Sequence, residues 1–366
     1  MDTTPINYEL TFKPDLKKFT FHGTESILVY CKKLTNTITM NCAELKIKSC
    51  QVKFAGKIIK STPKTNEKNE ELQIRLREKI KGKVTINLEF QGILNDRLLG
   101  FYRSQYKQGG KTKYLATTQF EAADARRAFP CWDKPEAKAS FEISIIADNK
   151  FTAISNMPIK SKKKVGSKTI YKFGKTPVVS TYLIYLGVGD FEYLTGKIGK
   201  TQIRVVTTKG NKSKGKFSLE LGKKLLASYE KYFGIKFPLP KLDLIAIPDF
   251  AAGAMENWGA ITFRETILLY DPKTSSTRTK QYIAEVISHE IAHMWFGNLV
   301  TMKWWNDLWL NESFATFMAT KFVDKFYPEW DLWNQFVEDA MNNAMGLDSL
   351  KTTHPIDVKV NSPAEI

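Results

Sequence analysis

The sequence predicts a multidomain protein in which an all-β domain is followed by an α+β domain. The chain has 366 residues, which is long for one compact core and makes two domains the natural expectation. Up to about residue 195, apolar and polar residues alternate with a period of two, as in residues 8–12, 84–90 and 141–145. This alternation indicates many short β-strands. We therefore expect domains at 1–195 and 196–366.

The second domain begins where the period changes. Apolar residues from 216 to 233 recur with helical spacing and give one apolar stripe. Three short apolar runs indicate strands, at residues 202–207, 242–247 and 259–265. Further helical patterns follow, at residues 277–297, 308–326 and 329–346. Mixed strands and helices of this kind predict an α+β domain.

Charge and composition exclude several classes of protein. The net charge of +17 suggests a nucleic-acid partner, but residues 242–366 carry 9 Lys and Arg against 17 Asp and Glu. The remaining excess of +25 on residues 1–241 is scattered lysine without interleaved aromatic residues, which favours solvated hairpin tips over nucleic-acid binding. No run approaches the roughly 20 apolar residues that span a bilayer. We expect neither a nucleic-acid nor a membrane partner.

The four cysteines and the first residues bear on the cellular compartment. Cys31, Cys42, Cys50 and Cys131 form no C-x-x-C pair, and the polar start of the chain has no basic and apolar segments of a signal peptide. Free buried thiols are therefore expected, with a disulfide among the first three as the alternative. We expect a cytoplasmic protein.

The strongest functional signal is His289-Glu290-Ile291-Ala292-His293. Residues four apart lie on the same face of a helix, so both imidazoles can bind one metal ion. Glu290, next to the first ligand, can then reach the open position on that ion. This H-E-x-x-H pattern is typical of zinc peptidases, although alone it also fits a solvated charge pattern on any helix.

A third ligand is expected at Glu312, because catalytic zinc sites usually have three protein ligands and His₂Glu is one standard set. Glu312 lies 19 residues after His293 on the next predicted helix, and residues 297–303 can turn the chain between them. Zinc would lower the pKa of its bound water, and Glu290 would take the proton. The other two histidines, His22 and His354, have no ligand-like neighbours.

Three long motifs together resemble the gluzincin aminopeptidases of the aminopeptidase N type, which include puromycin-sensitive aminopeptidases, tricorn-interacting factors and leukotriene hydrolases. Gly253-Ala-Met-Glu-Asn257, with the following residues 258–265, resembles their exopeptidase signature. Residues 289–315 resemble their zinc segment, and residues 117–135 resemble a motif of their N-terminal domain. The resemblance implies a saddle-like β domain, a thermolysin-like catalytic domain, and removal of one residue at a time from the N-terminus of peptides.

The resemblance also implies roles for particular residues. Glu256 would bind the free α-ammonium of the substrate, assisted by Glu121; Glu121 could instead belong to a structural ion-pair group with its charged neighbours. Gly253 and Ala254 would lie on an edge strand beside the substrate backbone, Met255 would border the first side-chain pocket, and Asn257 completes the substrate-binding motif. A carboxylate is the chemistry that recognises an ammonium group.

Two departures from the family pattern matter. Ser313 replaces a glycine of the zinc segment, with little expected effect. The family's oxyanion-stabilising tyrosine and its C-terminal helical domain lie beyond the point where this chain ends at Ile366. A truncated fragment with reduced or no activity is therefore expected, since losing one oxyanion donor costs about 100- to 1000-fold in rate. The alternative is a zinc-containing but catalytically silent peptide-binding module.

Overall fold

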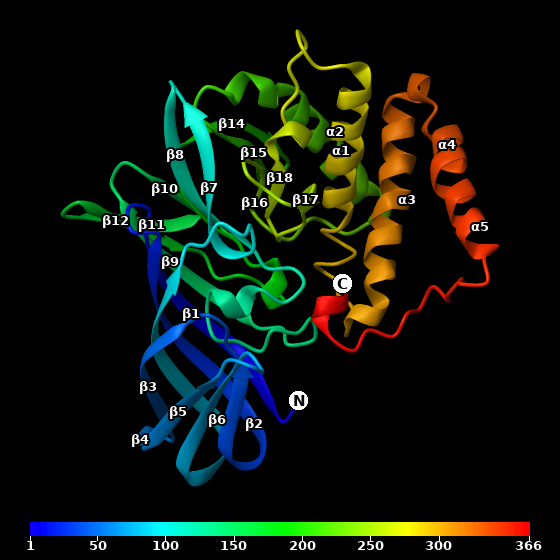
Figure 1. Ribbon diagram of the computed structural model, residues 1–366. Helices are drawn as coiled ribbons and strands as arrows, with labels where there is room; N and C mark the ends of the chain where they lie inside the picture. Colours follow the sequence, from blue (N-terminus) through cyan, green and yellow to red (C-terminus); the bar gives the residue numbers. More distant parts are fainter. The chain divides into compact units, whose positions relative to one another are not determined.

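The computed structural model describes residues 1–366. The chain forms two compact units, Met1–Phe191 and Glu192–Ile366, which occupy the blue-to-green and the green-to-red parts of Figure 1. Strand β14 (Phe191–Ile198) continues through the boundary predicted after residue 195. The all-β and α+β characters predicted for the two parts are confirmed.

The first unit consists of two β-sheets. The larger has nine strands in the order β11-β12-β9-β1-β2-β6-β3-β4, with β5 paired to β6, and the smaller has the order β10-β13-β8-β7. Their bounds are β1 (Thr3–Asp15), β2 (Thr20–Asn41), β3 (Lys46–Phe54), β4 (Lys57–Ile59), β5 (Ser61–Asn66), β6 (Glu71–Ile93), β7 (Gly100–Gln108), β8 (Lys111–Gln119), β9 (Ser140–Asp148), β10 (Thr152–Ser155), β11 (Ile159–Val165), β12 (Lys168–Phe173) and β13 (Leu186–Gly189).

The core of this unit lies between the two sheets. Alternate residues of β1 and β2 are buried, as the period of two requires. Phe101 from the smaller sheet contacts Phe12 and Phe21 of the larger one, with ring centroids 5.8 and 5.1 Å apart. Tyr8 stacks on Phe141 of β9 at 4.8 Å. Aromatic residues from both sheets therefore form one continuous apolar layer.

The second unit combines one sheet with five helices. Its sheet has the order β14-β15-β16-β18-β17. The element bounds are β15 (Thr201–Thr208), α1 (Lys216–Phe233), β16 (Lys241–Ile247), β17 (Ala254–Met255), β18 (Ala260–Arg264), α2 (Thr277–Ala292), α3 (Leu308–Phe326), α4 (Leu332–Gln335) and α5 (Asn342–Asp348).

The central strand of this sheet, β16, is buried and paired on both sides. It runs parallel to β15 and β18, and every one of its residues is buried, as is typical of parallel strands covered on both faces. Two charged residues, Lys241 and Asp243, lie in this buried strand. Asp243 accepts hydrogen bonds from Lys241 Nζ at 2.8 Å and from Arg204 Nε and Nη2 of β15, both at 2.6 Å.

The helices pack side by side in the order α1, α2, α3, α4 (Figure 1). Helix α1 has the predicted bounds and ends at Gly234, which has the left-handed φ of 66° that glycine adopts without strain. Helix α2 ends at Ala292 rather than at 297, so the predicted end is wrong. Gly297 has a φ of 127°, and the chain turns there instead of continuing the helix.

The last predicted helix, at 329–346, is also wrong in detail. Residues Phe336–Met341 form a π-helical segment between α4 and α5. The chain then returns to the start of α3, where Trp304 Nε1 donates to Val360 O at 2.7 Å and Val360 N donates to Asn306 Oδ1 at 2.9 Å. None of the helices has both the length and the apolar character needed to cross a bilayer.

Candidate metal centre and substrate site

Helix α2 carries the two histidines of the predicted metal site. Ser276 caps the helix by accepting a hydrogen bond from Thr279 N at 3.1 Å. Ile283, Ile287 and Ile291 are buried along one side of the helix. This anchored stripe fixes the rotation of α2, so that His289 and His293 lie one turn apart on the side facing α3.

The three predicted ligands converge. His289 Nε2 lies 2.9 Å from His293 Nε2 and 3.2 Å from Glu312 Oε2, and His293 Nε2 lies 3.6 Å from Glu312 Oε1. Ligand atoms bound to a tetrahedral zinc ion at about 2.0 Å lie roughly 3.3 Å from one another. The donor set and the observed spacings therefore fit zinc.

The second nitrogen of each histidine has a partner that orients the ring. His293 Nδ1 lies 2.9 Å from Phe296 O, a carbonyl that can accept a hydrogen bond from Nδ1 and so leaves Nε2 as the nitrogen that faces the cluster. His289 Nδ1 lies 3.3 Å from Thr316 Oγ1 of α3. Partners of this kind are typical of metal-ligating histidines, because they fix the tautomer and the ring orientation.

Two further carboxylates lie beside this cluster. Glu290 and Glu256 are 6% and 4% exposed, and each has one buried carboxyl oxygen without a hydrogen-bond partner. Burial raises the pKa of Glu290 well above its usual value. The positive charge of His293 lowers this pKa, and the negative charges of Glu256 and Glu312 raise it further. Burial likewise raises the pKa of Glu256, with His293 opposing. These unpartnered oxygens can bind a cation or accept a hydrogen bond from a water molecule.

The charges of the cluster show why a cation suits it. Burial lowers the pKa of His293, but the carboxylates of Glu256, Glu312 and Glu290 outweigh burial and raise it to about 10. For Glu312, burial acts to raise the pKa, while hydrogen bonds and charge from the two histidines lower it overall. Three acidic groups surround one imidazole, so positive charge at this position is strongly favoured.

The predicted exopeptidase segment lies in and beside strand β17, the last strand of its sheet. Gly253 and Ala254 line a cavity of about 260 Å³ together with His289 and Glu290. Met255 is buried against β18, where it pairs with Thr262. The structure thus brings Gly253, Ala254 and Glu256 to the metal cluster.

Asn257 lies differently from what its predicted role suggests. Its side chain is fully buried and its Nδ2 donates to Thr262 Oγ1 at 3.1 Å. Asn298, which the sequence analysis did not single out, donates from Nδ2 to Glu256 O at 2.8 Å. Asn298 follows the turn after α2, and this contact joins the turn to the segment that carries Glu256.

Glu121 belongs to the other unit, two residues after the end of β8, and is joined to Ala122 by a cis peptide bond. The arginines near it in sequence have other acidic partners: Arg127 Nε lies 2.7 Å from Asp124 Oδ1, and Arg126 Nε lies 3.2 Å from Asp133 Oδ2. The role of Glu121 at the substrate remains a prediction.

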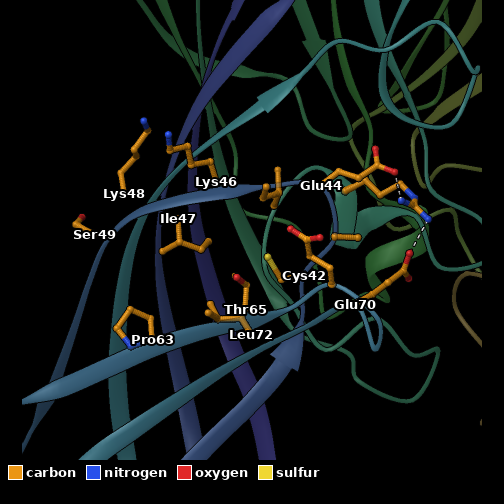
Figure 2. A pocket seen from close by; sticks show the side chains of 14 residues that line it. Cys42, Glu44, Lys46, Ile47, Lys48, Ser49, Pro63, Thr65, Glu70 and Leu72 are labelled. Carbon is orange, nitrogen blue, oxygen red and sulfur yellow. Dashed lines mark hydrogen bonds and ion pairs between the residues drawn. The ribbon is translucent and has the colours of Figure 1, made fainter.

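Another cavity, of about 810 Å³, lies in the first unit and contains none of the predicted site residues. Figure 2 shows Glu44 and Glu70 at one end of it and Lys46 and Lys48 of β3 at the other. Both glutamates accept hydrogen bonds from Arg127. Glu44 and Glu70 are already paired with arginines, and no histidine lines this cavity. The smaller cavity beside His289 is therefore the one that the chemistry favours.

Comparison with known proteins identifies the family of the chain. The family model described as "Peptidase family M1 domain" matches residues 217–366, and the model described as "Peptidase M1 N-terminal domain" matches residues 4–183. The chain belongs to peptidase family M1.

Curated relatives extend along nearly the whole chain. Aminopeptidase M1-D of Oryza sativa subsp. japonica is 43% identical over 364 residues, which are 99% of this chain and 42% of the relative. The puromycin-sensitive aminopeptidase of Caenorhabditis elegans is 43% identical over 99% of this chain and 39% of its own length. The probable aminopeptidase 2 of Sulfurisphaera tokodaii is 46% identical over 98% of the chain and 44% of its length. The chain therefore spans about two-fifths of the length of these relatives.

Proposed function

We propose that the chain carries the metal centre of a zinc-dependent aminopeptidase, which hydrolyses the peptide bond after the N-terminal residue of a peptide. The observation that supports this most is the convergence of His289, His293 and Glu312 beside two buried, incompletely paired carboxylates. The first three residues would hold one zinc ion. When bound, zinc polarises the scissile carbonyl and acidifies a water molecule.

Glu290 is the proposed general base. It is next to the ligand His289 on α2, and burial leaves its Oε2 without a partner. A carboxylate in this position accepts the proton of the attacking water and can return it to the leaving amine. The low water access around Glu290 strengthens its interaction with nearby positive charge.

Glu256 is the proposed site for the free α-ammonium of the substrate. Its unpartnered Oε1 can accept a hydrogen bond from that ammonium. Asn298 holds the backbone of Glu256 in place. We propose that Gly253, directly before β17, and Ala254, its first residue, pair with the substrate backbone. Met255, Asn257 and Glu121 are proposed to support this binding segment.

The first test of the proposal measures turnover and metal content together. Glu290→Gln keeps the size of the side chain but removes the base, so hydrolysis of a leucine anilide should fall at least about 100-fold while zinc stays bound. Hydrolysis at the wild-type rate in this variant would overturn the proposed role of Glu290.

The second test measures recognition of the amino terminus without turnover. Leucine hydroxamate should bind the zinc-loaded chain more tightly than N-acetyl-leucine hydroxamate in calorimetry. Glu256→Gln should reduce this preference by about tenfold or more, because a charged hydrogen bond is lost. Equal affinity of the wild type for both compounds would contradict the exopeptidase assignment.

We also propose a cytoplasmic location. All four cysteines are free thiols, and three of them are buried; free thiols are usual in a reducing compartment. Imaging of a fluorescent fusion would test this, and a signal confined to the secretory pathway would contradict it.

A further inference from the structure

The cavity beside the metal cluster contains a carboxylate that the proposed hydrolysis does not use. Glu285 lines this 260 Å³ cavity together with His289 and Glu290. It lies four residues before His289 in α2, so both side chains lie on the same face of the helix, one turn apart. The cavity therefore begins at the metal cluster and extends one helical turn towards the start of α2.

The opposite wall is built by α3. Thr316 and Thr320 lie four and eight residues after Glu312, so the three side chains follow one another along the same face of that helix. The rest of the lining is small and uncharged, and consists of Gly253, Ala254, Val286 and Ala319. Glu285 and Glu290, both on α2, are the acidic residues that line the cavity, and Glu290 belongs to the metal cluster.

Glu285 has no positively charged partner. Its Oε1 accepts a hydrogen bond from Gln281 Nε2 at 2.9 Å, and the same Nε2 lies 2.8 Å from Gln335 Oε1. Burial raises the pKa of Glu285 above its usual value; Gln281 and the charge of Arg278 act against this, and Asp339 adds to it. The ionised carboxylate is thus half-buried with a neutral donor as its direct partner, and a cation in the cavity would stabilise it.

Building on the proposed function, we propose that this cavity receives a basic side chain, lysine or arginine, of the bound peptide, and that Glu285 selects it. The volume corresponds to roughly nine water molecules in the liquid, which is enough for an extended amine chain. The neutral walls accommodate the methylene groups, while Glu285 attracts an ammonium or guanidinium group and repels an acidic one.

The α-ammonium of the substrate is the other possible source of positive charge. Glu256 is the more suitable partner for it, because Glu256 is more deeply buried than Glu285 and has an unpartnered oxygen. The test must therefore vary the side chain while the free amine stays constant.

Calorimetry with phosphinic pseudodipeptides provides this test. The compounds all have a free amine and differ in one side chain, which is that of lysine, norleucine or glutamate. Two series are used: one places the variable residue before the phosphinate and the other places it after. In one series, the zinc-loaded chain should bind the lysine compound about fivefold to tenfold more tightly than the norleucine compound, the ratio expected for a partly buried ion pair. The glutamate compound should bind most weakly, and added salt should reduce these differences.

Variants of Glu285 assign the selectivity to this residue. Glu285→Gln should bring the lysine-to-norleucine ratio to about one, and Glu285→Lys should reverse the order in favour of glutamate. Glu338→Gln, at an exposed acidic residue of the same unit, is the matched control and should keep the wild-type ratio. Circular dichroism and zinc content establish that each variant is folded and loaded.

The outcomes separate this inference from the function on which it rests. A ratio near one in both wild-type series, or an unchanged ratio in Glu285→Gln, would overturn the selectivity of Glu285 alone. Binding of the norleucine compounds that is absent, or independent of zinc, would overturn the proposed function and this inference with it.

Discussion

At the scale of single residues, the same side chain has a different role according to what surrounds it. Glu290 and Glu256 are buried beside two imidazoles, where an incompletely paired carboxylate is useful for chemistry. Glu25 is buried in the other unit, near the start of β2, and neither of its carboxyl oxygens has a partner. Its cross-strand neighbours are Leu10 and Leu88, so an apolar row surrounds it.

Glu25 therefore makes stability depend on pH. Burial raises the pKa of Glu25 well above its ordinary value of 4.5. Because the folded pKa is higher than the unfolded one, the folded state binds the proton more tightly; this stabilisation is complete below about pH 4.5 and is lost as the pH rises through the folded pKa. In that window the free energy of unfolding should fall by up to about 1.4 kcal/mol per pH unit.

Glu25→Gln should remove this loss of stability. In urea denaturation, the free energy of unfolding of the variant should therefore rise relative to that of the wild type as the pH rises from mildly acidic to mildly basic values. Glu89→Gln, at an exposed residue of the neighbouring strand β6, is the matched control. A constant difference between Glu25→Gln and wild type across this pH range would show that Glu25 is not a buried neutral acid.

At the scale of elements, the strand β16 depends on a buried group of charges. Asp243 is fully buried and forms ion pairs with both Lys241 and Arg204. Burial lowers the pKa of Lys241 to about 8, although the charge of Asp243 opposes this. Removing one member of a buried charged group is costly, because the remaining charges stay desolvated without a partner.

Asp243→Asn should therefore lower the free energy of unfolding by about 3 kcal/mol or more, measured by chemical denaturation at neutral pH. The exposed Asp357→Asn serves as the control, with a change of less than about 0.5 kcal/mol. A loss below about 1 kcal/mol for Asp243→Asn would mean that the group of charges does not stabilise β16.

Periodicity predicted the elements well where a single apolar stripe or alternation controls them. The bounds of α1 and α3 match the predicted ranges, and the strand alternation of the first unit is real. The end of α2 and the π-helical segment Phe336–Met341 were missed, because the turn at Gly297 and the packing of α4 depend on tertiary contacts. The buried charges of β16 were missed for the same reason, since Arg204 and Asp243 are 39 positions apart in sequence.

The candidate site was predictable to the extent that it is local in sequence. His289, Glu290 and His293 follow from helical spacing, and the structure brings Glu312 and Glu256 to them. Glu285 lies four residues before His289, and Thr316 lies four residues after Glu312. The same helical spacing could therefore have predicted that both side chains lie beside the metal cluster. Asn298 carries no such signal, because its contact with Glu256 O depends on how the turn after α2 folds back.

At the scale of the whole molecule, two folded units support one proposed activity. The second unit contains the metal cluster, the general base and the cavity with Glu285. The first unit contains Glu121, the cavity of about 810 Å³, and the residues matched to the M1 N-terminal domain. The central claim, that α2 and α3 together form one zinc site, concerns the second unit.

Zinc content measured by mass spectrometry on the purified 366-residue chain tests this claim most directly. The wild type should retain one zinc ion per chain after dialysis, and His293→Ala should lose it, because three ligands are reduced to two. His354→Ala, at an exposed histidine outside the cluster, should keep the ion. Equal zinc content in His293→Ala and wild type, or none in the wild type, would contradict a zinc centre formed by His289, His293 and Glu312.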